Sequence, residues 1–510
     1  MYTSTFSRGL ALLAALLCAS AASADDNPPK CQYVMVGELP LRYSGPGLAL
    51  TTEGRVNGTP ATVLINTGGS DNFLTRTLTE RLDLPLSMTG KHALGIGGYS
   101  RLYQTRLSEF AVGPARAGKG HFMVLGDTGA PPPYDATVGA PFLLQADMEV
   151  SLAEKKLRFF RPRDCGSTFL GYWSQDVFTL PYVNHFGSNP NPHFMIEVNG
   201  KEMTAQISTG AASTAIMSSA ARKAGLRLDS PNSARMSDVT GVGTDRVGRW
   251  STTLDTLKIG AEVVRNAEIE VLDTSDPSNA DVLLGDDFLR AHRVLFAMSQ
   301  GKLYISYLGG EPFKLHRGLE PWVVQEAESG NPDAQLVMAG VYRAGRAVPR
   351  DDKQADAWLE KAAALGHPQA NLQLGRRLMA QHRYADAAGH LRRALDAQPA
   401  SRASALWLYI ARLRNGQPDL AKQELEAAFS RGERGDWPSP IADFYLGKID
   451  AAALLDAAGK ESDLSKARTC AATLFMSELY GARDDTAQAE ATLASWRAHC
   501  APAAQTASAK

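Results

Sequence analysis

Short stretches of alternating or β-branched apolar residues make up most of the chain from residue 33 to residue 308. Gly, Asn, Asp and Pro separate these stretches, a pattern typical of β-strands joined by turns. Two segments inside this region predict short helices instead, TRTLTERLDL (residues 75–84) and SSAARKAGLRL (residues 218–228), and Ser218 is a reasonable N-cap for the second. From about residue 320 the composition shifts to Ala, Leu, Gln and Arg, with few β-branched residues. The pattern therefore predicts a β-rich part followed by a helical part.

The β-rich part contains an internal repeat. Residues Thr62, Ile65, Thr67, Gly68 and Leu84 recur 142 positions later as Thr204, Ile207, Thr209, Gly210 and Leu226. Later in the copies the offset is 146: GIGG (95–98) matches GVGT (241–244), VGAPFL (138–143) matches LGDDFL (284–289), and KKLRFF (155–160) matches GKLYIS (301–306). One loop insertion accounts for the change in offset, so we predict two copies of one β-domain.

The helical part also repeats. Residues Gly330, Pro332, Ala334 and Leu336 recur 36 positions later as Gly366, Pro368, Ala370 and Leu372. A period in the mid-thirties with helical apolar spacing is typical of stacked helix pairs. The segment 348–366 resembles a Sel1-type repeat, and segments 384–399 and 419–429 resemble tetratricopeptide helices. We expect such repeats over residues 320–500 and a disordered tail over 501–510, with a protein-binding surface or a purely structural array as the two readings of the repeats.

Three features occur in the same order in both copies of the β-domain. A hydrophobic stretch runs into a Thr-Gly turn, a glycine-rich hairpin follows, and a hydrophobic–hydrophobic–Gly sequence then precedes a short helical start. In these features the region resembles a tandem of retropepsin-like aspartic protease domains, the fold shared by retroviral proteases and by each lobe of pepsin. The resemblance implies two all-β lobes, at residues 31–165 and 176–308, ahead of the all-α repeat domain. It assigns flap-like positions to Gly95, Gly97, Gly98, Gly241 and Gly243, and a second glycine turn to Gly139 and Gly285.

The chemistry of that family requires an acid before each Thr-Gly pair. Two carboxylates share a proton there, one acting as base on a water while the other donates to the substrate carbonyl. Carried over residue by residue, the supporting loop residues match as Thr67, Gly68, Thr209 and Gly210. The positions of the two acids hold Asn66 and Ser208 instead. An amide does not titrate and a Ser hydroxyl is a very weak acid, so we expect no catalytic residue at either position.

Other residues offer alternative sites. Asp71, Asp286 and Asp287 follow the glycine turns, where carboxylates favour helix N-termini. Ser208 with His193 as its base would make a hydrolase, although a lone His is more often structural. No ligand spacing indicates a metal, and no motif calls for a cofactor. We therefore expect a pseudoenzyme that binds extended peptide or protein segments, with an active peptidase of non-standard site and a cell-envelope scaffold as the alternatives.

The N-terminus predicts export. Arg8 precedes GLALLAALLCASAASA (9–24), which is too short for a membrane span and ends in a small-residue cleavage site. We expect residues 1–24 to be a signal peptide and the mature protein to be periplasmic, without stable membrane insertion. A lipoprotein anchored through Cys18 is disfavoured because Leu17 is large for that motif. The formal net charge of −1 gives no reason to expect a nucleic acid partner.

Four cysteines remain after removal of the signal peptide: Cys31, Cys165, Cys470 and Cys500. An even number in an oxidising compartment favours two disulfides. The suggested pairing is Cys31 with Cys165, which bracket one domain, and Cys470 with Cys500 in two C-terminal helices. The other two connectivities and four separate thiols remain alternatives.

Overall fold

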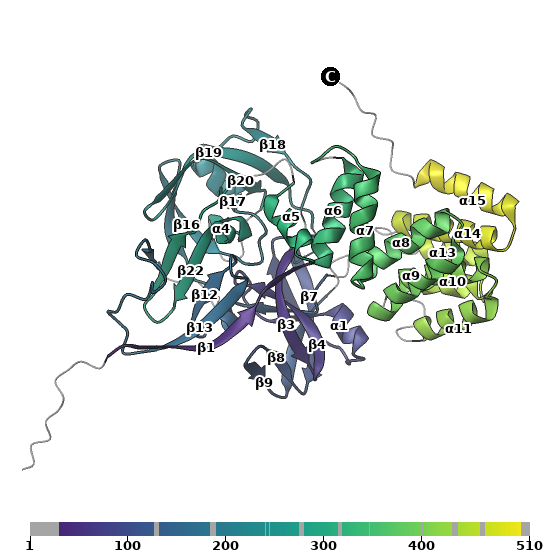
Figure 1. The fold of residues 1–510 in the computed structure, drawn as a ribbon, viewed down its shortest axis with the longest axis horizontal. Coiled ribbons are helices and arrows are strands. Elements are labelled where there is room, and N and C mark those ends of the chain that lie inside the picture. Colours follow the sequence, from purple (N-terminus) through teal and green to yellow (C-terminus); the bar gives the residue numbers. More distant parts are fainter. Residues whose placement is uncertain are drawn as a thin grey trace, which may run out of the picture.

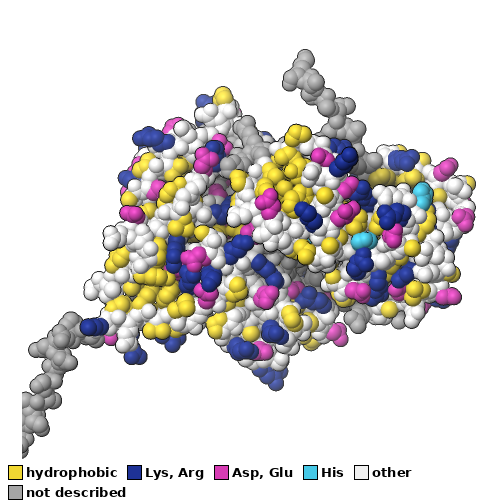
Figure 2. Space-filling model, viewed as in Figure 1, with side chains coloured by type: hydrophobic (Ala, Val, Ile, Leu, Met, Phe, Trp, Pro, Cys, Tyr) yellow, Lys and Arg dark blue, Asp and Glu magenta, His cyan; other side chains and the backbone are white. Residues whose placement is uncertain are grey.

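The computed structural model describes residues 30–126, 132–183, 190–239, 241–243, 245–274, 280–314, 319–345, 347–399, 401–430, 437–459 and 465–500. Its N-terminal half is β-rich and its C-terminal part is a run of helices (Figure 1). The predicted signal peptide and the predicted C-terminal tail lie outside the described residues. Within these ranges, no helix combines the length and the apolar character that a membrane span requires. Basic and acidic side chains are interspersed over the face in Figure 2, as the near-zero net charge leads one to expect.

The first copy of the repeat, here called lobe 1, is built on a sheet with the strand order β6-β7-β10-β5-β11-β4-β3-β8-β9, and β2 pairs with β3. Strand β11 lies parallel to β4 and antiparallel to β5, so it separates the two strands that flank the first Thr-Gly turn. The elements are β2 (Arg42–Ser44), β3 (Ala49–Val56), β4 (Thr59–Asn66), β5 (Phe73–Thr75), α1 (Arg76–Arg81), β6 (Ser87–Gly95), β7 (Gly98–Leu107), β8 (Phe110–Val112), β9 (Ala115–Ala117), β10 (Gly120–Leu125), β11 (Ala136–Gly139) and α2 (Ala140–Leu143).

The second copy, lobe 2, repeats this arrangement in a sheet with the order β15-β16-β21-β17-β20-β19-β18. Strand β21 lies parallel to β16 and antiparallel to β17, as β11 does between its neighbours. The elements are β15 (Phe194–Val198), β16 (Lys201–Ile207), β17 (Ala215–Met217), α3 (Ser218–Lys223), β18 (Ser233–Arg235), β19 (Arg249–Ile259), β20 (Glu262–Leu272), β21 (Val282–Leu284) and α4 (Asp286–Ala291). The predicted N-cap is wrong: Ser218 is the first helical residue, because α3 follows β17 directly and Met217 takes the cap position.

A third sheet joins the two lobes. Its order is β1-β13-β12-β22-β23-β14, and the antiparallel pair β12–β22 forms the seam between the halves. The fully buried carboxylate of Glu149 accepts hydrogen bonds there from Arg158 (2.7 Å) and, across the seam, from Arg293 (2.8 Å). The strands are β1 (Gln32–Pro40), β12 (Asp147–Ser151), β13 (Lys156–Arg163), β14 (Phe178–Pro181), β22 (His292–Ala297) and β23 (Lys302–Tyr307).

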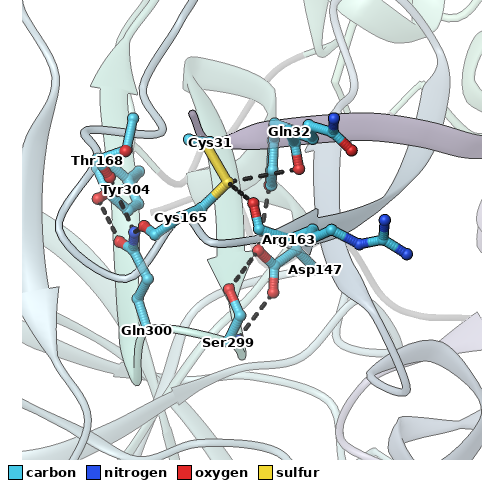
Figure 3. The surroundings of a disulfide bond; sticks show 10 residues. Cys31, Gln32, Asp147, Arg163, Cys165, Thr168, Ser299, Gln300 and Tyr304 are labelled. Carbon is cyan, nitrogen blue, oxygen red and sulfur yellow. Dashed lines mark hydrogen bonds between the residues drawn. A yellow bond between two sulfur atoms is a disulfide. The ribbon is translucent and has the colours of Figure 1, made fainter. Parts of the chain in front are cut away.

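Both disulfides are present with the suggested pairing, Cys31–Cys165 and Cys470–Cys500. The first lies at the edge of the third sheet (Figure 3), where the side chain of Gln300 donates to the carbonyl of Cys165. The second disulfide joins α14 to α15, a helix whose side chains are all at least partly exposed. Two such bonds are typical of a protein in an oxidising, extracytoplasmic compartment.

Several of the C-terminal helices begin at a polar N-cap residue, at a proline, or at both. Asn331, Asp351 and His367 cap their helices through their side chains, and Pro follows two of these caps at the first helical position. The run is consistent with helical repeats. The helices are α5 (Pro321–Glu328), α6 (Pro332–Ala344), α7 (Asp352–Ala364), α8 (Pro368–Ala380), α9 (Tyr384–Ala397), α10 (Arg402–Arg414), α11 (Pro418–Phe429), α12 (Ser439–Tyr445), α13 (Ala451–Gly459), α14 (Ser465–Ala482) and α15 (Thr486–His499).

The first two of these helices share one hydrophobic core with the lobes. Trp322 in α5 packs on Tyr43 of lobe 1, with ring centroids 4.8 Å apart, and Arg290 of lobe 2 lies 4.4 Å from a Trp322 ring centroid. Asp333 in α6 accepts a hydrogen bond of 2.8 Å from the main-chain N–H of Gly45. Helices α5 and α6 are therefore part of the same packed body as both lobes.

Candidate active site

The two Thr-Gly turns hold each other by exchanged hydrogen bonds. The hydroxyl of Thr67 donates to the carbonyl of Ile207 (2.7 Å) and accepts from the main-chain N–H of Thr209 (3.1 Å). In return, the hydroxyl of Thr209 donates to the carbonyl of Ile65 (2.9 Å) and accepts from the N–H of Thr67 (3.0 Å). Both Thr side chains are buried, so these bonds satisfy groups that water does not reach. The two Thr-Gly turns, Thr67-Gly68 and Thr209-Gly210, are therefore joined at the boundary of the lobes, and together they are called the loop unit here.

Replacing Thr67 by Val should lower the free energy of unfolding by about 3 kcal/mol, because the carbonyl of Ile207 and the N–H of Thr209 both lose a buried partner. The measurement is equilibrium unfolding in urea. The matched control is Thr52→Val, which removes a buried hydroxyl that donates one bond to the carbonyl of Pro40. Equal losses in the two variants would contradict a special role for the exchanged bonds.

Asn66 and Ser208 bring their side chains together against the glycines of these turns. A Cβ atom on Gly68 would lie 2.5 Å from Ser208 Oγ and 3.3 Å from Asn66 Oδ1. A Cβ atom on Gly210 would clash with the amide of Asn66. Both turns therefore need glycine to admit the side chain from the opposite lobe. The side chains at these two positions are an amide and a hydroxyl, both neutral groups that can donate and accept hydrogen bonds.

Each glycine turn after the loop is braced by a side chain that the sequence analysis did not single out. Asn72 accepts a hydrogen bond of 2.9 Å from the N–H of Gly139, and Thr214 accepts one of 3.1 Å from the N–H of Gly285. Asn72 and Thr214 are related by the same offset as the two Thr-Gly turns. The shared spacing indicates that the two positions correspond. Because the two side chains differ, residue identity alone does not show that both accept a hydrogen bond from a glycine N–H.

A second pair of repeat-related side chains also accepts hydrogen bonds from the main chain. Asp135 accepts a hydrogen bond of 2.9 Å from the N–H of Thr62, and Asp281 accepts one of 3.0 Å from the N–H of Thr204. These carboxylates bind the middle of the strand that leads into each Thr-Gly turn. The aspartates recur with the second offset of the repeat, so the sequence contained this signal too.

The second glycine turns pack tightly behind the loops. A Cβ atom on Gly139 would lie 2.5 Å from the carbonyl oxygens of Asp71 and Gly69. A Cβ atom on Gly285 would lie 2.6 Å from the carbonyl carbon of Ser213. Any larger residue at either position would push the strand carrying it away from the loop.

The two glycine-rich segments meet at their tips. Gly97, in the turn between β6 and β7, donates to the carbonyl of Val242 (3.0 Å), and its own carbonyl accepts from the N–H of Asp245 (2.9 Å). Gly243 has a φ of 114° and lies so close to Gly97 that a Cβ atom would clash with its carbonyl. The side chain of Ile96 packs against an apolar cluster of lobe 2 that includes Met217. The tips are thus joined by main-chain bonds and by one apolar contact.

The remaining candidate acids lie at other positions. The exposed carboxylate of Asp71 accepts from the N–H of Asn72 (2.8 Å), and Asp286 and Asp287 occupy the first turn of α4. Burial raises the pKa of both α4 carboxyls, that of Asp286 to about 8. In the described ranges, no hydrogen bond or ion pair joins any of these carboxylates to the side chain of Asn66 or Ser208.

The candidate base for Ser208 is His193. It is buried beside the start of β15, and its main chain pairs with Val183. Among the described residues, no hydrogen bond links its ring to Ser208. Over the same ranges, His, Cys, Asp and Glu form no cluster of three that would hold a metal ion.

Comparison with known families agrees with this geometry. A family model described as an aspartyl protease matches residues 52–142, and one described as a gag-polyprotein putative aspartyl protease matches residues 194–291. Each matched segment contains one Thr-Gly turn, one glycine-rich segment and one second glycine turn. No curated protein matches the chain. The N-terminal half of the chain thus carries two aspartyl-protease-like domains, and a run of helices follows them.

Proposed function

We propose that this protein is an exported pseudo-aspartic protease, which binds extended peptide or protein segments between its lobes without cleaving them. The observation that carries the proposal is the loop unit itself. Its threonines and glycines make the exchanged hydrogen bonds and close contacts of a working centre, while Asn66 and Ser208 occupy the positions of its acids. Without a carboxylate to take a proton from water, the reaction of this family has no general base.

Binding requires main-chain partners for an extended segment, and the glycine-rich tips offer them. The N–H and carbonyl of Gly97 are bonded to the opposite tip in this structure. When the tips separate, the same groups become available to a peptide backbone, which pairs with them as an added strand does. The apolar cluster under Ile96 then offers a pocket for a peptide side chain. The leader sequence and the two disulfides support export.

A scaffold role is the second candidate. It is favoured by the closed tips and by the shared core that fixes α5 and α6 to both lobes. In that reading the lobes hold the helical array in place and bind no peptide.

The test is incubation of the mature protein with a diverse peptide pool, followed by recovery of bound peptides and mass spectrometry of the whole pool. We expect bound peptides to be recovered intact from acidic to neutral pH. Ile96→Asp should weaken retention about tenfold, because it places a carboxylate beside the apolar pocket that receives a peptide side chain when the tips separate. The matched control, Met88→Asp, lies on the same strand pair at a side chain that is 76% exposed, and it should retain peptides as the wild type does.

Two results would contradict the proposal. Cleavage by the wild type would show that an unrecognised group replaces the acids and would restore the active-peptidase reading. A folded protein that retains no peptide would leave the scaffold reading in its place.

A further inference from the structure

Four helices of the C-terminal part, α6, α8, α10 and α14, line one surface groove. Its volume is about 520 Å³, and it is lined by Arg343, Arg376, Arg377, Trp407, Arg414 and Glu478, together with smaller contributions from the same helices. Helices α6, α8 and α10 are each separated in the chain by one intervening helix (Figure 1), so the groove runs across successive helix pairs. A groove of this kind presents side chains in a row, which suits an extended chain better than a compact ligand.

The groove carries an excess of positive charge. Arg343 lies 2.7 Å from the carboxylate of Asp356, and Arg377 pairs with the same carboxylate. Arg414 is 3.6 Å from Glu478. Among the described residues, no carboxylate lies within ion-pair distance of Arg376. Three of these four guanidinium groups therefore share two carboxylates, which leaves a local surplus of positive charge in a protein whose net charge is close to zero.

Aromatic side chains contact two of the arginines, Arg376 and Arg414. The guanidinium of Arg376 lies 4.8 Å from a ring centroid of Trp407, a stacking contact that fixes its plane. Arg414 donates from Nη1 to the hydroxyl of Tyr384 (3.3 Å), and its Nη2 lies 3.6 Å from the carboxylate of Glu478. A guanidinium has five N–H donors, so both arginines retain donors for a ligand. Trp407 and Met379 give the floor of the groove an apolar character.

We propose that this groove binds an acidic, extended protein segment, with its carboxylates paired to Arg376 and Arg414. Planar guanidinium groups bind carboxylates through two parallel hydrogen bonds, which is stronger and more directional than the pairing of a Lys. The inference goes beyond the proposed function, because it concerns the helical part of the chain. It does not depend on the site between the lobes.

The test uses the full mature protein and a fluorescent peptide of Glu, Leu and Gly, compared with the same peptide in which Gln replaces every Glu. Fluorescence anisotropy should show binding of the Glu peptide that weakens as salt is added, and binding at least tenfold weaker for the Gln peptide. Arg376→Gln should weaken the Glu peptide about tenfold. The control Lys422→Gln removes an exposed cation from α11, outside the groove, and should have no effect.

Each of the following results would overturn the inference: equal affinity for the two peptides, no loss in folded Arg376→Gln, or no binding of the Glu peptide by the folded wild type. Inorganic polyphosphate serves as a competitor, with its concentration counted in negative charges. If it displaces the Glu peptide at a lower concentration of negative charge than the peptide itself supplies, the groove is a general anion site and the inference is overturned. Ile96→Asp separates the two proposals. It should impair retention of the peptide pool between the lobes and leave binding of the Glu peptide unchanged.

Discussion

The double variant Asn66→Asp, Ser208→Asp is expected to cleave peptides that the wild-type protein leaves intact. The side-chain oxygens of both positions lie within 3.3 Å of one point beside Gly68, so two carboxylates introduced there would lie close enough to share a proton. The loop unit that would hold them is already built by Thr67 and Thr209. Proton transfer by such groups accelerates a reaction by about 10²–10⁴. Cleavage should be greatest at acidic pH, where the pair carries one proton.

The measurement is mass spectrometry of the peptide pool after incubation from acidic to neutral pH. Asn66→Asp and Ser208→Asp alone are the controls, and each should remain far below the double variant because one carboxylate lacks its partner. The double variant should also have a lower unfolding midpoint than the wild type at neutral pH, since two buried like charges replace two neutral groups. A folded double variant with no activity would contradict the view that only the acids are missing.

Asp286→Asn is expected to stabilise the protein at alkaline pH and to have little effect near pH 4. The side chain of Asp286 is 3% exposed, and among the described residues its Oδ1 has no hydrogen-bond partner. Burial raises the pKa of this carboxyl to about 8, although the nearby Arg290 acts to lower it. The unfolded chain loses this proton near pH 4, whereas the folded protein keeps it until about pH 8. Stability therefore falls as the pH rises through this window.

An amide at this position removes the dependence, and the variant should gain up to about 6 kcal/mol over the wild type at pH 9, because the two pKa values differ by about four units. Thermal unfolding of both proteins across the pH range measures the effect. Asp255→Asn is the matched control, because it removes an exposed carboxylate from the same lobe and should shift the midpoint by a similar small amount at every pH. A gain for Asp286→Asn that does not change with pH would mean that the burial of this carboxyl does not set its titration.

The fold class was predictable because each of its parts has a local period. The strands and the helical repeats follow from patterns within short segments of sequence. The correspondence of Thr67 with Thr209 follows from the repetition of one such segment 142 positions later. The contacts between tips, such as Gly97 with Gly243, depend on where distant loops meet, and no local pattern encodes that. The same is true of the packing of Trp322 on Tyr43. The cap predicted at Ser218 failed because a strand runs directly into the helix, which moves the helix start by one residue.

The supporting residues of the candidate site show a different limit. Thr67, Gly68, Thr209 and Gly210 were found because the same residue types recur in both copies. Asn72 and Thr214 each accept a hydrogen bond from the N–H of a second glycine turn, but their side chains differ. A search for identical residues therefore does not detect them. The geometry of the hydrogen bond, an oxygen that accepts from a glycine N–H, is what the two positions share.

The sheet that unites the lobes has a consequence for how this centre evolved. Because β12 and β22 pair within one chain, the halves meet at a high effective concentration and need no second copy to complete the centre. In a symmetric dimer of one chain, a substitution at a position on the axis enters both subunits together. In a single chain each half can carry its own residue, and here Asn stands on one side of the centre and Ser on the other. The same freedom left Asp286 and Asp287 in one helix start and Ala140 and Pro141 in its counterpart.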